Sequence, residues 1–133
     1  LLDFNPVKTN EEAGFTVIMD EKHHYEIAVV RDIQNKKIIV RKTIGKLSSI
    51  VAEEVIDDGA VKLEISTDMG EYYFKYAVGQ NPFKEMAAGE AKYLSSEVAG
   101  GFIGVYLGLY STGNGIRNIA PADFEYFKYK VIK

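Results

Sequence analysis

Carboxylates are the residues of this chain best suited to catalysis, because two of them placed on either side of a glycosidic bond can hydrolyse it. On a single strand, such acids alternate as Glu-x-Asp-x-x-Glu. The nearest match is Glu64-Ile65-Ser66-Thr67-Asp68, which has serine where the pattern requires aspartate. Glu53, Glu54, Asp57 and Asp58 flank an expected turn and are interpreted as solvated. The sequence therefore predicts no catalytic acid pair.

His23, His24 and Asp123 are the candidates for metal binding. Adjacent residues on a strand point to opposite faces, so the two histidines cannot easily share one ion. They are interpreted as a pair at the end of a turn on a sheet edge. Asp123 begins an aromatic strand, where a buried carboxylate needs hydrogen-bond donors or a cation. Backbone N–H groups of Gly113-Asn114-Gly115 are its expected partners. Structural Ca²⁺ is the alternative, but it needs several more oxygen ligands, so no cofactor is expected.

Aromatic residues near the end of the chain form a third candidate site. In residues 105–110, aliphatic residues alternate with tyrosines, so the valine and leucines share a core-facing side. Tyr106 and Tyr110 share the other side and flank a glycine. This flat aromatic surface, together with Phe124 and Tyr126, suits a sugar ring, a peptide or a neighbouring domain. The alternative is that these rings fill a core or a domain interface, where aromatic residues are common.

Short strands must position these residues. They are expected at 15–19, 25–31, 37–42, 50–56, 61–65 and 72–78, with two more from 105 and across 123–131. Turn signals recur about every 8–12 residues, which is the spacing of an antiparallel two-sheet sandwich. Residues 84–92 are rich in helix formers, although a glycine interrupts them. Local propensity leaves a helix and a strand equally open there.

Composition limits the function. The chain has 133 residues, which suits one domain. Its net charge is −3 and its largest basic groups are Lys36-Lys37 and Arg41-Lys42, which argues against nucleic acid as a partner. No apolar run is long enough to span a membrane. Cysteine is absent, so disulfides and thiolate metal sites are excluded. The compartment, cytoplasmic or secreted, stays open.

Four segments carry a resemblance to a known family. They are residues 12–17 (EAGFTV), 23–26 (HHYE), 94–104 (LSSEVAGGFIG) and 122–129 (ADFEYFKY). In this order and at this spacing they resemble the C-terminal β-sandwich module of family-43 glycoside hydrolases, the β-xylosidase and arabinofuranosidase group. The resemblance covers nearly the whole chain. It implies a concanavalin A-like jelly roll over residues 1–133, with an irregular strand at residues 84–92 and one helical turn near residues 96–99.

The resemblance also implies a function. The chain would be a non-catalytic module that stabilises a five-bladed catalytic propeller of the same polypeptide, which acts on xylan or arabinoxylan fragments. In the resembling hydrolases, a phenylalanine in the loop that matches Phe102 closes the sugar pocket of the propeller. An ordinary core phenylalanine is the alternative. The family module begins upstream of the position that Leu1 resembles and the chain has no initiator methionine, so we interpret it as a fragment without its first strands.

Two other functions stay open. An independent carbohydrate-binding module would hold xylo- or arabino-oligosaccharides on its aromatic surface. A free-standing jelly-roll glycanase would need the acid pair that the sequence lacks. If the first strands are absent, an exposed sheet edge is expected to recruit another strand. A homodimer, formed through that edge or through the aromatic surface, is therefore predicted.

Overall fold

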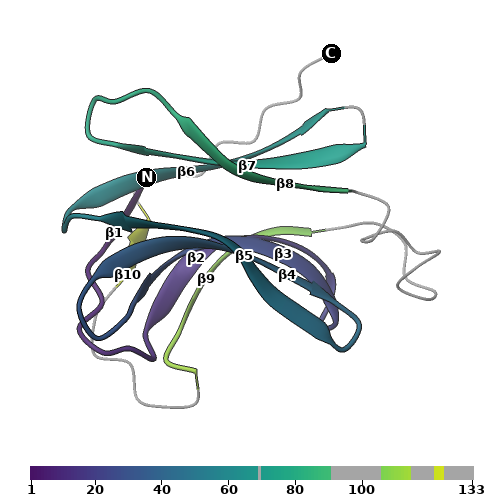
Figure 1. Ribbon diagram of the computed structural model, residues 1–133, viewed down its shortest axis with the longest axis horizontal. Coiled ribbons are helices and arrows are strands. Elements are labelled where there is room, and N and C mark those ends of the chain that lie inside the picture. Colours follow the sequence, from purple (N-terminus) through teal and green to yellow (C-terminus); the bar gives the residue numbers. More distant parts are fainter. Residues whose placement is uncertain (69, 91–105, 115–121, 125–133) are drawn as a thin grey trace.

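The computed structural model describes residues 1–68, 70–90, 106–114 and 122–124 and shows two antiparallel sheets packed as two layers (Figure 1). The first sheet has the order β10-β1-β6-β7-β8 and the second the order β5-β4-β3-β2-β9. The first comprises β1 (Leu2–Phe4), β6 (Ala60–Asp68), β7 (Glu71–Val78), β8 (Lys84–Glu90) and β10 (Ala122–Phe124). The second comprises β2 (Glu12–Asp20), β3 (His23–Arg31), β4 (Lys36–Ile44), β5 (Leu47–Ile56) and β9 (Tyr106–Thr112). The expected antiparallel sandwich is confirmed.

The hydrophobic core lies between the two sheets. Alternate residues of each strand point into it, as the strand period of two requires. Tyr25 of β3 is fully buried and meets the edges of Tyr72 and Phe74 of β7, with ring centroids 6.2 Å apart in both pairs. Edge-to-face contacts of this kind stabilise aromatic pairs beyond the area that they bury. These rings therefore join the centres of the two layers.

The segment with conflicting signals, residues 84–92, contains strand β8, and a register shift opposite Phe74 and Lys75 makes it the irregular strand that was expected. Helix propensity is outweighed because β8 pairs along β7, with Ala87 opposite Phe74. Met86 and Ala87 also pack against the core. The helical turn expected at residues 96–99 lies outside the described residues. Among the described residues, no helix is long and apolar enough to cross a membrane.

The histidine pair begins β3, but the expectation of a sheet edge is wrong. β3 lies between β2 and β4, because β2 and β4 each form a hairpin with it. His23 Nδ1 lies 2.9 Å from Asp20 Oδ1, whereas His24 Nδ1 lies 2.6 Å from Glu26 Oε2. Each histidine therefore has its own carboxylate partner.

The alternation predicted for β9 agrees with its register. Leu107 and Leu109 pair with Val17 and Phe15 of β2, so they share the core-facing side with those residues. They are nevertheless 36% and 41% exposed, because β9 is at the edge of its sheet. Of the strand expected at 123–131, only Asp123 and Phe124 lie within the described residues, at the end of β10.

Candidate functional site

The outer face of the second sheet carries four polar side chains that contact one another. They come from Glu12 of β2, Glu26 of β3, Arg41 of β4 and Tyr110 of β9, and we call them the Arg41 cluster. Tyr25 and Ile27 point into the core, so Glu26 between them points outward. Glu12 and Glu26 are each only 4% exposed. Glutamates are seldom buried this deeply unless they have partners.

Small residues on the two middle strands leave space for the cluster. Gly14 of β2 pairs with Ala28 of β3, and both lie on the diagonal between Arg41 and Glu12. A Cβ atom on Gly14 would lie 2.3 Å from the carbonyl oxygen of Ile27 and 2.7 Å from Ala28 Cα. Tyr110 of β9 also pairs with Gly14. The long side chains of Arg41 and Tyr110 can therefore extend across the sheet face above these small residues.

The guanidinium of Arg41 holds both carboxylates. Its Nη1 donates to Glu12 Oε2 and to Glu26 Oε1, each at 3.0 Å, and its Nη2 donates to Glu12 Oε1 at 2.9 Å. The pairing with Glu12 is thus bidentate, which is the strongest geometry for an arginine and a carboxylate. The hydroxyl of Tyr110 donates a short hydrogen bond to Glu12 Oε2. Four neighbouring strands are joined through this one cluster.

The surroundings shift the pKa values of the donors. The hydrogen bonds with Glu12 raise the pKa of Arg41, and the charge of Glu12 adds to this effect. Burial raises the pKa of Tyr110, and the adjacent Glu12 carboxylate raises it further. Arg41 therefore stays charged and Tyr110 stays a neutral donor. Each donates hydrogen bonds to Glu12, and neither can act as a base at neutral pH.

This geometry does not suit hydrolysis. A glycosidase needs room between its two carboxyl groups for the scissile bond, with one group protonated and the other ionised. In the Arg41 cluster a guanidinium lies between Glu12 and Glu26. No sequence pattern predicted this cluster. Glu26 was detectable as the only acid within the expected strand 25–31, whereas Glu12 lay outside the expected bounds of its strand.

His24 at the rim of the cluster makes stability depend on pH. Its hydrogen bond with Glu26 raises its pKa above the ordinary value of 6.5. The folded state therefore binds this proton more tightly than the unfolded state, so the stabilisation is complete below 6.5 and is lost as pH rises through the raised pKa. Urea unfolding between about pH 5.5 and 9 should show the free energy of unfolding falling with pH. His24→Gln should flatten that slope, and an unchanged slope would exclude His24 as its source.

The aromatic candidates are distributed over both sheets. Tyr110 is on the outer face of the second sheet, where its hydroxyl is bound to Glu12. Tyr106 shares that face by register, since it pairs with Ile18, but its side chain is outside the description. Phe124 belongs to β10 of the first sheet and packs against the core. Phe102 and Tyr126 lie outside the described residues. The structure thus separates Tyr110 from Phe124.

Asp123 pairs with Asp3 of β1 in the first sheet, and its side chain is not described. One of its expected donors is used elsewhere, because the backbone N–H of Asn114 donates to Thr112 Oγ1 at 3.0 Å. Asn10 holds the same loop by donating to the carbonyl of Gly113 at 2.7 Å. In the described part of the chain, no three His, Asp or Glu side chains gather to hold a metal ion. Backbone hydrogen bonding of Asp123 stays a prediction, with calcium as its alternative.

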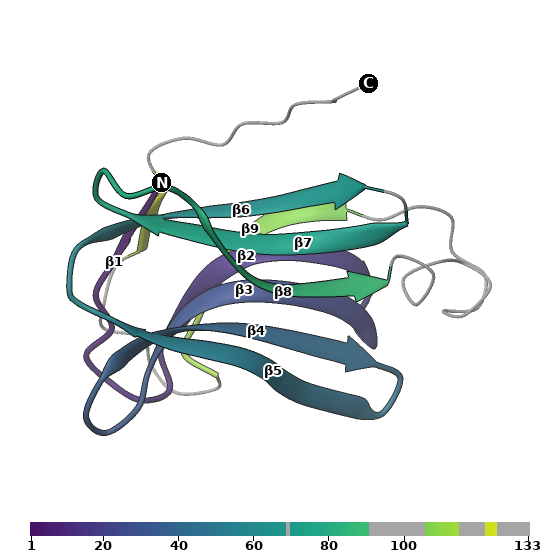
Figure 2. The ribbon, with the colours of Figure 1, turned by 45° about the horizontal axis from the view of Figure 1, so that its top comes forward.

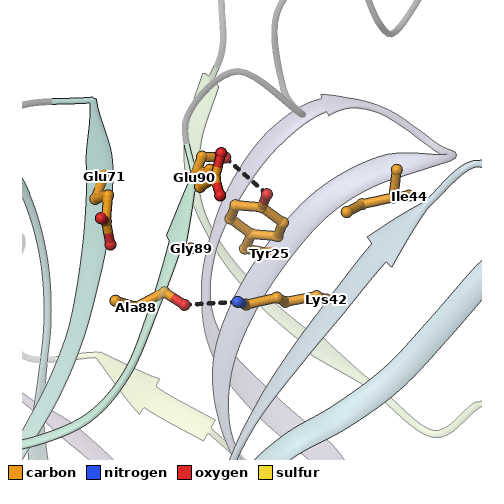
Figure 3. A pocket seen from close by; sticks show the side chains of 7 residues that line it. All are labelled: Tyr25, Lys42, Ile44, Glu71, Ala88, Gly89 and Glu90. Carbon is orange, nitrogen blue, oxygen red and sulfur yellow. Dashed lines mark hydrogen bonds between the residues drawn. The ribbon is translucent and has the colours of Figure 1, made fainter.

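A small hollow of about 260 Å³ lies between the sheets where β8 ends (Figure 3). Polar contacts inside it join the two layers. The hydroxyl of Tyr25 donates to the carbonyl of Glu90 at 2.8 Å, and Lys42 Nζ donates to the carbonyl of Ala88 at 2.5 Å. A Cβ atom on Gly89 would lie 2.8 Å from the Tyr25 ring. The residues that line the hollow therefore pack closely around Tyr25, and their hydrogen bonds join the two sheets.

A larger cleft of about 570 Å³ lies between the end of β5 and the turn from β7 to β8. Tyr76 and Phe83 supply aromatic rings, and Phe83 is 45% exposed. Asp57, Asn81 and Lys84 supply polar groups. Sites for small molecules commonly combine apolar walls with a few polar groups of this kind.

Comparison with known proteins gives consistent matches. The family described as "Beta xylosidase C-terminal Concanavalin A-like domain" matches residues 1–130. A non-reducing end α-L-arabinofuranosidase of Bacteroides ovatus is 32% identical over 132 residues, which are 98% of this chain and 25% of that protein. A xylosidase/arabinosidase of Butyrivibrio fibrisolvens is 28% identical over 130 residues, or 95% of this chain and 24% of that protein.

Solved structures agree with these matches. A structure described as Bacteroides ovatus xyloglucan PUL GH43B superposes with a TM-score of 0.85 at 30% identity, covering 91% of this chain and 24% of that one. A xylan β-1,4-xylosidase from Bacillus halodurans superposes with a TM-score of 0.81 at 16% identity, with the same coverage, and shows the shared fold. The chain spans about a quarter of the length of the relatives that it matches.

Proposed function

The chain belongs to the family of β-xylosidase C-terminal concanavalin A-like domains, and from this membership we propose that it is the non-catalytic accessory module of a glycoside hydrolase. The observation that carries the proposal is the coverage. Relatives named arabinofuranosidase and xylosidase match almost all of this chain with only about a quarter of their own length. The remaining three quarters have room for a catalytic domain.

The Arg41 cluster supports a non-catalytic role for the module itself. Glu12 and Glu26 lie close together on the outer face of the second sheet. Both are bound to the guanidinium of Arg41, and Glu12 also accepts from Tyr110. Elsewhere Glu64, the acid weighed from the sequence, faces Lys75 at 3.8 Å in the first sheet. Neither arrangement leaves two free carboxyl groups across a substrate-sized gap.

The purified chain is accordingly expected not to hydrolyse aryl xylosides or aryl arabinofuranosides. Release of nitrophenol should stay at the level of the protein-free blank, because the described residues offer no free acid pair. The polypeptide that carries this module serves as the positive control. Turnover by the isolated chain that disappears in Glu12→Gln or Glu26→Gln would overturn the proposal.

The finer part of the proposal concerns the partner domain. We assign the module to a five-bladed propeller of the same polypeptide, which acts on xylan- or arabinoxylan-type glycosides. In this assignment the module stabilises the propeller and helps to form its pocket wall. The residues proposed for this wall or the domain interface are Phe102, Tyr106, Tyr110, Phe124 and Tyr126. The family resemblance supports Phe102, since residues 94–104 carry one of its motifs.

In the intact polypeptide, Phe102→Ala is expected to lower kcat/KM for small substrates by about 10–100-fold, because a lost wall weakens positioning and admits water. The melting temperature of the isolated module should hardly change. Phe83→Ala is the matched control, because it also truncates a phenylalanine. Phe83 is exposed and lies before β8 in the chain, whereas residue 102 lies after β8. A large fall in melting temperature would instead identify Phe102 as a core residue, with a loss of about 3–5 kcal/mol.

A second candidate function is independent carbohydrate binding. The cleft beside β5 favours it, because the exposed ring of Phe83 lies near Asp57 and Asn81. Sugar rings stack their C–H faces on aromatic rings, and carboxylate and amide groups bond their hydroxyls. Retention of the isolated chain on xylan would favour this candidate, and free elution would favour the accessory role alone.

A further inference from the structure

Strand β5 leaves an unusually long apolar edge exposed. It is the terminal strand of the second sheet and pairs with β4 alone among the described strands, as Figure 2 shows at the border of the lower layer. It has ten residues, and four of its apolar side chains are strongly exposed: Leu47 at 77%, Ile50 at 50%, Val51 at 47% and Val55 at 58%. Natural proteins usually shorten, charge or cover such an edge, because it offers unpaired N–H and C=O groups to another strand.

A β-bulge divides this strand into two halves. Ala52 pairs with Val40 and Ile50 pairs with Arg41, which leaves Val51 without a partner on β4. Val40 points into the core and Arg41 points outward, so the faces of β5 follow from the register. Ser48, Ile50, Glu53 and Val55 are on the outer face, whereas Leu47, Ser49, Ala52, Glu54 and Ile56 are on the inner face.

We propose that β5 pairs with β5 of a second copy of this chain, antiparallel and about a two-fold axis between Val51 and Ala52. A two-fold axis at this point sets Leu47 opposite Ile56 and Ser49 opposite Glu54 on the inner face. On the outer face it sets Ser48 opposite Val55 and Ile50 opposite Glu53. Directly opposed residues in an antiparallel pair must share a face. The bulge at the axis makes all four pairs satisfy that requirement.

The charges that flank the strand also complement one another in this register. Lys46 immediately precedes β5 and Asp57 immediately follows it. The axis sets Lys46 of one copy opposite Asp57 of the other, and this pairing occurs twice. Glu53 and Glu54 lie opposite Ile50 and Ser49, so no like charges face each other. A shift that set Glu53 of one copy against Glu53 of the other would oppose like charges on one face, which destabilises cross-strand pairs. In this register the strand therefore complements a second copy of itself, because opposed residues share a face and opposite charges meet at both ends.

This dimer goes beyond the proposed accessory function and does not depend on it. The edge of β5 is on the long side of the sandwich, whereas residues 91–105, which contain Phe102, follow the end of β8. None of the residues proposed for the pocket wall or the domain interface belongs to β5.

Disulfide trapping tests the register directly, because the chain has no cysteine. In Ser48→Cys/Val55→Cys, the two positions are about 23 Å apart along one strand, too far for an internal bond. In the dimer each faces the other position of the second copy. Mild oxidation should give a covalent dimer that is absent in both single variants. Monomer alone from the double variant, or equal crosslinking by the single variants, would overturn the proposal.

A pair of opposite charges at Ile50 gives a second test. Ile50→Glu would face Glu53 of the second copy, so sedimentation should show at least a tenfold rise in the dimer dissociation constant. Ile50→Lys would face the same glutamate and should keep the dimer. Within its own chain Ile50 pairs with Arg41, so the glutamate suits the fold better than the lysine does. Loss of the dimer therefore cannot be due to misfolding. An equal effect of both variants, or a monomeric parent chain at all concentrations, would overturn the proposal.

Discussion

Replacing Arg41 by methionine is expected to lower the free energy of unfolding by about 3 kcal/mol or more. The guanidinium makes three hydrogen bonds to Glu12 and Glu26. The side chains of these glutamates are each 5% exposed. Without Arg41, two carboxylates would remain buried on neighbouring strands with their countercharge removed. Because the Arg41 side chain itself is 26% exposed, water can partly replace it, so we expect the lower part of the usual range for broken buried pairs. Chemical unfolding of the isolated module measures the effect.

Lys37→Met is the matched control for this change. Lys37 lies on the same strand and pairs with Asp32 at 2.9 Å and Glu53 at 3.6 Å. Those carboxylates are 42% and 56% exposed, so water solvates them when the lysine is gone and the loss should be far smaller than that of Arg41→Met. Arg41→Lys should fall between the two, because an ammonium cannot bond Glu12 bidentately. Equal losses in the methionine variants would show that the Arg41 cluster is no more than a surface ion pair.

Tyr25→Ala is expected to have a comparable or larger effect, a loss of about 3–5 kcal/mol. The ring of Tyr25 is fully buried and touches Tyr72 and Phe74 of the opposite sheet edge-on. Lys42 Nζ lies 5.7 Å from the ring centroid, and the hydroxyl donates to the carbonyl of Glu90. Truncation leaves a cavity that the two rigid sheets cannot close. The melting temperature should fall by roughly 10–20 °C for a domain of this size.

Tyr25→Phe separates packing from hydrogen bonding at this site. It keeps the ring and both edge-on contacts and removes only the hydroxyl, so the loss should be about 1–2 kcal/mol. Calorimetry on both variants gives the comparison. If the phenylalanine variant lost as much as the alanine variant, the hydrogen bond to β8 would be the main interaction, and the contacts with Tyr72 and Phe74 would contribute little.

The sequence could predict which residues share a face of a strand, but it could not predict how far each face is exposed to solvent. Alternation placed Leu107 and Leu109 on the core side of β9, and their pairing with Val17 and Phe15 confirms this. Their exposure depends on the position of β9 at a sheet edge, which no local pattern encodes. Strand order also places Tyr110 and Phe124 in different sheets, which the local pattern of aromatic residues could not indicate.

The Arg41 cluster was beyond local reasoning because its members are distant in sequence. Arg41 and Glu12 are 29 residues apart, and Tyr110 and Glu12 are 98 apart. Only the register of three strand pairs brings them together. Strand β8 was ambiguous for a related reason, since its helix formers become a strand only when β7 provides a hydrogen-bonding edge. Propensity is a weak guide wherever tertiary pairing competes with it.

The position of β9 beside β2 has a consequence for the newly made chain. The hairpins from β2 to β5 and from β6 to β8 join neighbours in sequence, so each can close soon after it is synthesised. Strand β2 receives β9 only after almost a hundred further residues, as the 98-residue span from Glu12 to Tyr110 shows. At about 5–20 residues per second, that interval lasts roughly 5–20 seconds on the ribosome. During this time the second sheet has an open edge at β2 and the Arg41 cluster lacks Tyr110, so nascent β2 is open to pairing with other chains.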